Sequence, residues 1–220
     1  MTDAADERRH TDRHALYFYH DPMCSWCWGY RPVSDRLFAE LPEDLQLVKI
    51  VGGLAPDSDE PMPERLREQL PETWRRIHEL LGTEFNFDFW TRCEPRRSTY
   101  PACRAVLAAG RQGRYDDMLD AIQRGYYLRA MNPSNLDTLR TLAAEIGLDG
   151  ERFAADLVSA EVEEALRAEV DFSRQSPIDG FPSLVLDVAG KLEPVSRDYR
   201  DHRTSLGHIE RLRSGAEPVT

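Results

Sequence analysis

Apolar positions near the start of the chain predict a strand, a helix and a second strand. Residues 15–19 form a short apolar and aromatic run typical of a buried strand, and residues 45–51 form another, which two glycines end. Between them, apolar residues at helical spacing predict a helix that begins at or near Cys24, with Pro32 as a kink inside it. Strand, helix and strand at this spacing predict a βαβ unit with parallel strands.

The remaining pattern predicts a long helical region followed by a return to strands. Residues 184–188 and 192–195 read as a hairpin, and a last helix is expected over about 203–213. These late strands can complete the first sheet only if the helices between are an insertion. We therefore expect an α/β fold divided as follows: a flexible tail at 1–14, one α/β domain from 15–56 and 171–213, and an inserted all-helical domain at 57–170.

Composition narrows the function classes. The 220 residues carry a net charge of −11, which disfavours binding to nucleic acid or to anionic lipid surfaces. The first 14 residues are charged and unlike a secretory signal, and no run approaches the roughly 20 apolar residues that a membrane helix needs. We expect a cytoplasmic protein with no membrane contact, in which a close cysteine pair is more often catalytic or metal-binding than structural.

Two of the four cysteines lie three residues apart, in Cys24-Ser-Trp-Cys27. Cys24 falls at the start of the predicted helix, where unpaired N–H groups and the helix dipole favour a thiolate. Cys27, one turn deeper and shielded, could then attack a mixed disulfide formed on Cys24. A zinc site remains an alternative, but zinc normally takes a second pair at similar spacing, and Cys93 and Cys103 are ten apart. The position between strand and helix favours redox chemistry, and no metal is expected.

Residues 18–30, with Cys24-Ser-Trp-Cys27 at their centre, resemble the active site of the DsbA family of thioredoxin-fold proteins. They are most similar to its cytoplasmic, FrnE-like branch of predicted protein-disulfide isomerases. The resemblance covers about residues 15–213. It implies a thioredoxin fold interrupted by the inserted helices, with Pro32 as the kink proline of the active-site helix.

Gly180-Phe-Pro-Ser183 resembles the cis-proline loop of that family. The resemblance implies that Pro182 is cis and faces the active-site sulfurs, so that a substrate adds to the backbone of Phe181 as an extra strand. On its own sequence context, an ordinary trans proline at the start of a strand is the alternative.

Residues around the cysteine pair are expected to tune its chemistry. Neither Ser25 nor Trp26 is a cation, so we expect a reduction potential between about −270 and −120 mV, and Trp26 is a predicted substrate contact. The chain departs from its relatives at Phe18, where they carry a buried acid. Asp21 is a nearby alternative acid, with helix capping as its simpler role.

Cys103 and Arg104 lie at the start of a helix that, in similar proteins, faces the active-site cleft. The resemblance makes both of them, and Tyr100, candidate pocket residues. Cys103 is also a candidate third redox thiol, with Cys93 as its partner, or simply a small buried side chain.

Three functions follow from these observations. The first is a thiol-disulfide oxidoreductase or isomerase acting on protein or small-molecule disulfides, with Cys24 as nucleophile, Cys27 as resolving thiol and no bound cofactor. The second is a glutathione-dependent isomerase or kappa-class-like transferase, in which glutathione is the thiol. The third is a metal-binding or scaffold module. Glutathione is expected as a redox partner or cosubstrate in the first two; the sequence leaves the oligomeric state open.

Overall fold

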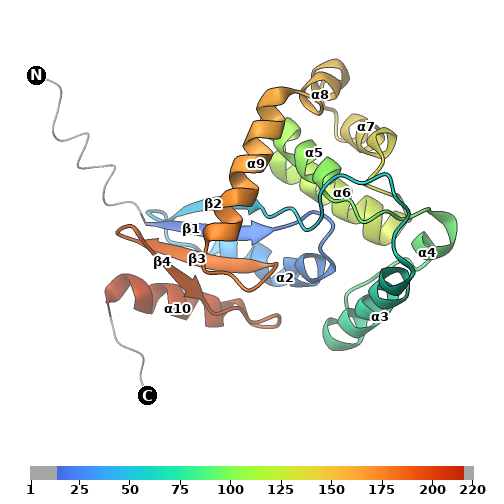
Figure 1. The fold of residues 1–220 in the computed structure, drawn as a ribbon. Coiled ribbons are helices and arrows are strands. Elements are labelled where there is room, and N and C mark those ends of the chain that lie inside the picture. Colours follow the sequence, from blue (N-terminus) through green and yellow to red (C-terminus); the bar gives the residue numbers. More distant parts are fainter. Residues whose placement is uncertain (1–13, 216–220) are drawn as a thin grey trace, which may run out of the picture.

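A four-stranded sheet forms the centre of the computed structural model, which describes residues 14–215. The strands lie in the order β2-β1-β3-β4 (Figure 1). Their bounds are Ala15–His20 for β1, Gln46–Val51 for β2, Ser183–Val188 for β3 and Lys191–Val195 for β4. β1 and β2 are parallel, whereas β1–β3 and β3–β4 are antiparallel. Strands from both ends of the chain therefore share one sheet, as predicted.

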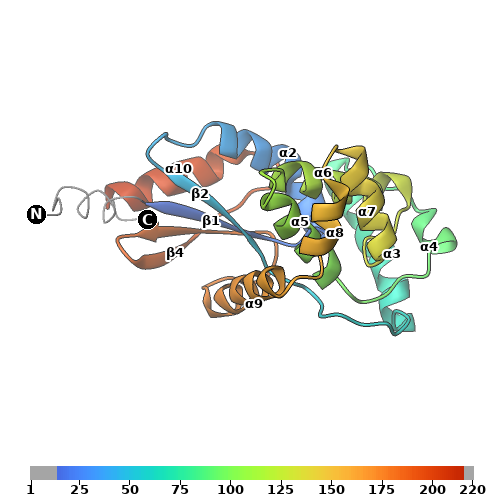
Figure 2. The same cartoon turned by 90° about the horizontal axis from the view of Figure 1, so that it is seen from above.

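Helices cover both faces of this sheet (Figures 1 and 2). α2 (Ser25–Ala39) and α10 (His202–Ser214) pack on one face, against a core that includes Leu16, Phe18 and Leu186. α9 (Ala160–Gln175) crosses the other face, where Phe172 contacts Tyr17 and Tyr19. The alternation along β1 thus buries its odd and even side chains against different helices.

The other helices form a second body beside the sheet (Figure 2). They are α3 (Glu64–Leu81), α4 (Phe89–Arg92), α5 (Tyr100–Gly110), α6 (Tyr115–Arg129), α7 (Leu136–Glu145) and α8 (Gly150–Asp156). Small and aliphatic side chains of α5–α8 build its main core, and an aromatic cluster around Trp74 builds a second one. This arrangement confirms a thioredoxin-like α/β fold interrupted by helices.

Two parts of the predicted division into domains can be compared with the structure: the boundary at residues 170/171 and the N-terminal tail. α9 runs unbroken through the expected boundary at residues 170/171, because one end packs on α5 and the other on the sheet. The predicted tail falls, apart from its last residue, outside the described residues. Within residues 14–215, no helix is both long enough and apolar enough to cross a membrane.

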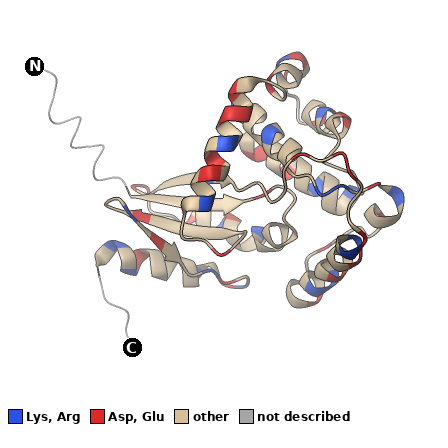
Figure 3. Cartoon of the chain, in the orientation of Figure 1, with Lys and Arg blue, Asp and Glu red and all other residues tan. Residues whose placement is uncertain are grey.

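Charged residues occur along the helices of both bodies (Figure 3). On α9, acidic and basic residues alternate, and Arg167 pairs with Glu163 one turn away. Arg129 on α6 likewise pairs with Glu145 on α7. Ion pairs of this exposed kind each contribute little to stability, about 0–1 kcal/mol.

Candidate active site

The loop between β1 and α2 places Cys24 at the N-cap of α2. Cys24 has extended backbone angles (φ −80°, ψ 114°), and its Sγ accepts a hydrogen bond of 3.3 Å from the backbone N–H of Cys27. The carbonyl of Asp21 accepts from the N–H of Cys24 at 3.0 Å, which closes the turn before the helix. The sulfur of Cys24 therefore occupies the position where helix N–H groups best stabilise a negative charge.

The loop before β3 faces Cys24 from the far end of the sequence. The Phe181–Pro182 peptide bond is cis, and the thiol of Cys24 donates a hydrogen bond of 3.4 Å to the carbonyl of Phe181. The Phe181 ring lies against Gly52, where a Cβ atom would come within 1.9 Å of the ring. A glycine just after β2 is therefore needed to seat the loop that faces Cys24.

Both cysteines of the pair are nearly buried. Cys27 is 4% exposed, so it is shielded as expected, and Cys24 is nearly as buried, at 6% exposed. The Phe181 loop, 157 residues away in sequence, provides a cover that local pattern could not reveal. Burial raises the pKa of the Cys27 thiol well above its usual range, and the Cys24 sulfur beside it raises that pKa further.

Asp21 joins the active-site loop to two other segments. Its Oδ1 accepts from the N–H of Met23 at 2.8 Å, and its Oδ2 accepts from the N–H of Leu54 at 2.8 Å and from Thr99 Oγ1 at 2.7 Å. The carboxyl is fully buried, and burial raises its pKa, while these hydrogen bonds act in the opposite direction. The simpler role that the sequence suggested, capping of α2, is wrong because the N-cap side chain is that of Cys24.

Cys103 lies in the core beside Asp21, and Cys93 lies elsewhere. The Cys103 thiol is fully buried on α5 and donates to Asp21 Oδ2 at 3.6 Å. Burial raises its pKa well above the usual range, and the negative charge of Asp21 adds to this effect. Cys93 instead packs against the aromatic cluster around Trp74 and donates to the carbonyl of Ala130 at 3.0 Å. The structure therefore does not bring these two cysteines together.

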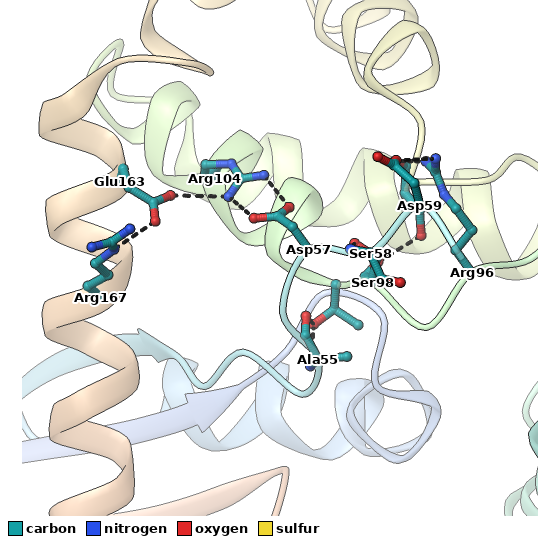
Figure 4. Close-up of polar contacts among 11 residues, drawn as sticks. Ala55, Asp57, Ser58, Asp59, Arg96, Ser98, Arg104, Glu163 and Arg167 are labelled. Carbon is teal, nitrogen blue, oxygen red and sulfur yellow. Dashed lines mark hydrogen bonds and ion pairs between the residues drawn. The ribbon is translucent and has the colours of Figure 1, made fainter. Parts of the chain in front are cut away.

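Arg104 is engaged by two carboxylates (Figure 4). Its guanidinium donates to Asp57, in the segment after β2, and to Glu163 on α9 at 3.1 Å. The cavity that Arg104 lines, of about 790 Å³, is bordered by neither Cys24 nor Cys27. Tyr100, one turn earlier on α5, packs beside Gly53 and Val170. In the structure, the guanidinium of Arg104 joins three segments of this chain. A role for Arg104 in substrate binding stays a prediction.

Residues 17–190 match the model of the thioredoxin family. The chain belongs to the thioredoxin family. Among solved structures, it is similar to a candidate protein disulfide isomerase from Nitrosomonas europaea (TM-score 0.80, 27% identity, 92% of this chain and 99% of that one). It also resembles the cytosolic disulfide reductase DsbM from Pseudomonas aeruginosa (TM-score 0.70, 30% identity, 91% and 96%), which has a second structure with GSH. These likenesses confirm a DsbA-like arrangement of the thioredoxin fold.

Curated relatives of this thioredoxin-family chain carry a different description. The ClpXP adapter protein SpxH of Halalkalibacterium halodurans is 28% identical over 189 residues, which cover 82% of this chain. The SpxH protein of Bacillus subtilis is 26% identical over 172 residues, or 77% of this chain. The matched region spans 61% and 56% of the length of these two relatives.

Aromatic side chains complete the thioredoxin-family site beyond the predicted residues. Trp26, between the two cysteines, is partly exposed and meets the ring of Tyr199 edge-on at 5.3 Å. Burial raises the pKa of Tyr199 to about 12, so it is a neutral phenol at ordinary pH. Tyr199 precedes α10, and no local signal in the sequence connects it with the cysteines. Trp28 stacks on Tyr127, and both pack in the aromatic cluster around the buried Trp74.

Phe18 occupies the position at which the family that this chain resembles carries a buried acid. Phe18 is 6% exposed and stacks on the ring of His20, so β1 offers no carboxylate on this face of the thioredoxin-family site. Among residues 14–215, no three His, Cys, Asp or Glu side chains are grouped to hold a metal ion. Asp21 is the buried acid that the structure places beside the active-site loop.

Proposed function

We propose that this chain is a thiol-disulfide oxidoreductase that exchanges disulfides through Cys24 and Cys27. The observation that carries the proposal is the environment of Cys24, whose sulfur caps α2, accepts the Cys27 N–H and meets the Phe181 carbonyl. A helix N-terminus favours the thiolate, which is the nucleophile in disulfide exchange. The likeness to a disulfide reductase, DsbM, supports the same chemistry.

In the proposed reaction, the Cys24 thiolate attacks one sulfur of a substrate disulfide. A bond forms between Cys24 and the substrate, and the other substrate sulfur leaves as a thiolate that takes a proton from solvent. Cys27 then loses its proton and attacks Cys24, which releases the second substrate thiol. The substrate gains two electrons, and the protein dithiol is oxidised to a Cys24–Cys27 disulfide. In the reverse direction, the same steps oxidise a dithiol substrate.

The substrate is proposed to lie across Trp26 and the loop of Phe181 and Pro182. The carbonyl of Phe181 already accepts a hydrogen bond at the reactive sulfur, which suits an extended backbone laid beside the loop. Protein or small-molecule disulfides are the proposed substrates, and glutathione is a proposed redox partner, supported by the structure of DsbM with GSH. We propose a cytoplasmic location, supported by the cytosolic DsbM, with no resident cofactor and no nucleic-acid or membrane partner.

Trapping the intermediate tests the assignment of the two cysteines. The Cys27→Ser variant, exposed to oxidised glutathione, should accumulate a mixed disulfide on Cys24, because the group that resolves it is gone. The Cys24→Ser variant is the matched control and should form little adduct, since the pKa of Cys27 is raised. Peptide mass mapping reads out the site. More adduct on Cys27 in the Cys24→Ser variant than on Cys24 in the Cys27→Ser variant, or an adduct mainly on Cys103 in either variant, would contradict the proposal.

Glutathione as the reacting thiol is a second candidate function, favoured by the DsbM structure with GSH. A glutathione-dependent isomerase or kappa-class-like transferase would use the Cys24 region to hold glutathione without a Cys24–Cys27 disulfide. The Cys27→Ser variant would then keep its full turnover with glutathione, whereas disulfide exchange predicts that its turnover falls sharply.

An adapter role is a third candidate, favoured by the SpxH relatives. An adapter binds its partner without electron transfer, so a Cys24→Ser, Cys27→Ser double variant would still bind ClpXP with unchanged affinity. Calorimetry measures that affinity. The oxidoreductase proposal instead predicts that the double variant loses all disulfide-exchange activity.

A further inference from the structure

Arg197 lies beside the loop that faces Cys24. It follows β4, which lies side by side with β3 (Figure 1), and the antiparallel pairing of the two strands ends at Leu184 and Val195. Continued two residues further, this register brings Arg197 level with Pro182. The open end of the last hairpin therefore places a guanidinium next to the loop that precedes β3.

The guanidinium of Arg197 contacts this loop on both sides of its cis peptide bond. One nitrogen donates to Asp179 at 2.9 Å, before the bond, and another donates to the hydroxyl of Ser183 at 3.2 Å, after it. Ser183 is 2% exposed, and its hydroxyl donates in turn to the carbonyl of Gly180 at 2.7 Å. Two donors of one rigid, planar group thus span the loop, a geometry that the single ammonium of a lysine does not reproduce.

Close packing does not hold the loop on the side of Arg197. A cavity of about 470 Å³ lies between the loop and the end of β4, and its lining includes Ile178, Asp179 and Arg197. On the opposite side, the Phe181 ring packs against Gly52. A shift of the loop toward the cavity would therefore meet open space, and it would break the two hydrogen bonds that Arg197 donates.

We propose that Arg197 is a positioning residue that holds the loop before β3 in place, so that the Phe181 carbonyl stays at Cys24. This inference rests on the proposed disulfide exchange. A substrate backbone laid along a fixed loop loses less freedom on binding than one that must first order the loop. Without Arg197, the loop moves toward the cavity, an extended substrate binds more weakly, and Cys24 loses part of its cover.

Arg197 also approaches a second wall of the site, and the two contacts must be separated. Burial raises the pKa of Tyr199 to about 12, while the charge of Arg197 acts in the opposite direction, and the Tyr199 ring meets Trp26 at 5.3 Å. Asp179 belongs to the loop, and its side chain is 78% exposed. The Asp179→Ala variant therefore breaks the contact from the loop side, leaves Arg197 beside Tyr199, and removes no buried group.

Single-turnover kinetics of the full chain test the proposal. The reduced protein is mixed with excess of a synthetic peptide closed by one disulfide between extended flanks, and tryptophan fluorescence follows oxidation of the protein. The dependence on peptide concentration gives the half-saturating concentration and the limiting rate. The small disulfide 5,5′-dithiobis(2-nitrobenzoic acid), which has no peptide backbone, is the comparison substrate. The variants are Arg197→Met, Arg197→Lys and Asp179→Ala, and Arg140→Met, which breaks an exposed ion pair on α7, is the control.

The proposal predicts a change in peptide binding without a change in chemistry. Arg197→Met should raise the half-saturating peptide concentration about tenfold, because it removes a charge-assisted hydrogen bond to a buried hydroxyl. Asp179→Ala should raise it about threefold, since its ion pair is exposed. Arg197→Lys should recover part of the loss, and Arg140→Met should match the unmodified protein. The limiting rate, and the rate with the small disulfide, should not fall in any variant.

Access to Cys24 is the second readout. In Arg197→Met, iodoacetamide should alkylate Cys24 several-fold faster than in the unmodified protein, because the shifted loop uncovers it. Cys103, which is fully buried on α5, should keep its rate, and peptide mass mapping distinguishes the two sites. A merely structural role for Arg197 would not separate these two cysteines. If Arg197→Met does not fold, Asp179→Ala carries both readouts.

An unchanged half-saturating peptide concentration in Arg197→Met and Asp179→Ala would overturn the proposal. Faster alkylation of Cys103 together with Cys24 would also overturn it, because a general loss of structure would then explain the effect. A lower half-saturating concentration in Asp179→Ala would do the same, since Arg197 would then bind the substrate and not the loop. If the unmodified protein does not reduce the peptide disulfide at all, the proposed disulfide exchange itself fails, and the two failures are therefore distinguishable.

Discussion

Burial and hydrogen bonding shift the pKa of the Asp21 carboxyl in opposite directions. The side chain is fully buried, which raises its pKa, yet it accepts from Met23, Leu54 and Thr99. These donors come from the active-site loop, the segment after β2 and the start of α5. A single residue therefore holds the Cys24 loop against both bodies of the molecule.

Replacing Asp21 by Asn should destabilise the protein. The amide has one acceptor oxygen in place of two, so its NH₂ group would face a donor from Leu54 or Thr99, and we expect a loss of about 1–3 kcal/mol. Urea denaturation measures this change. Asp137→Asn is the matched control, because the Asp137 side chain is 93% exposed and, among residues 14–215, forms an ion pair only with Arg140 one turn away. Equal stability of the two variants would contradict the role given to Asp21.

The residues of the site differ in how far the sequence reveals them. Cys24 and Cys27 could be found because their spacing and their position after a strand are local features. The hydrogen bonds of Asp21 to residues 33 and 78 positions away could not, since they depend on how α5 and the β2 loop pack. The cover that Phe181 places over Cys24 depends likewise on a contact across 157 positions.

At the scale of elements, Gly52 fixes the distance between the end of β2 and the loop before β3. An added Cβ would overlap the Phe181 ring at 1.9 Å, so Gly52→Ala must displace that ring, and we expect the loop that carries it to shift relative to Cys24. We expect disulfide-exchange turnover to fall at least tenfold, which an assay of disulfide reduction measures. Gly207→Ala on α10 is the control and should keep its turnover, because its nearest neighbour, the end of Arg211, lies 3.6 Å away. Unchanged turnover in Gly52→Ala would show that the loop position is unimportant.

A second contact between elements predicts how stability changes with pH. Glu169 on α9 accepts from the N–H of Val51 in β2 at 2.7 Å, and burial raises its pKa from 4.5 to about 7. The folded protein therefore holds a proton that the unfolded chain releases above pH 4.5. Stability from this group is present at low pH and is lost as pH rises through about 7, by up to about 3 kcal/mol.

The Glu169→Gln variant keeps an acceptor for Val51 and removes the titration. Its free energy of unfolding should fall less between pH 5 and pH 8 than that of the unmodified protein, measured by urea denaturation at each pH. Parallel curves for the two proteins would mean that Glu169 does not titrate in this range.

Elements were the most predictable level of this structure. The strands and the first and last helices follow from local apolar patterns and lie within a residue or two of the expected bounds. The end of the inserted helical region was less predictable. α9 keeps one amphipathic pattern along its whole length, although one end packs on α5 and the other on the sheet. The sequence pattern therefore does not show where the packing partner changes.

At the scale of the whole molecule, Arg104 ties the two bodies together. Its guanidinium bridges Asp57, which follows β2, and Glu163 of α9, and the side chain is 14% exposed (Figure 4). Arg104→Met should keep much of the packing but lose these charge-assisted hydrogen bonds, at a cost of about 1.5–3 kcal/mol in unfolding free energy. Thermal or urea denaturation measures the loss. An unchanged stability together with a raised KM for disulfide substrate would favour the predicted substrate role of Arg104 instead.

The central claim about the molecule is that Cys24 and Cys27 exchange electrons as a pair. A redox titration of the purified protein in glutathione buffers, followed by thiol alkylation and tryptophan fluorescence, tests it most directly. The account predicts one reversible two-electron transition with a midpoint between about −270 and −120 mV, absent in Cys24→Ser. If Cys24 and Cys27 stay reduced across the whole range, or if Cys24→Ser gives the same transition, the claim is contradicted.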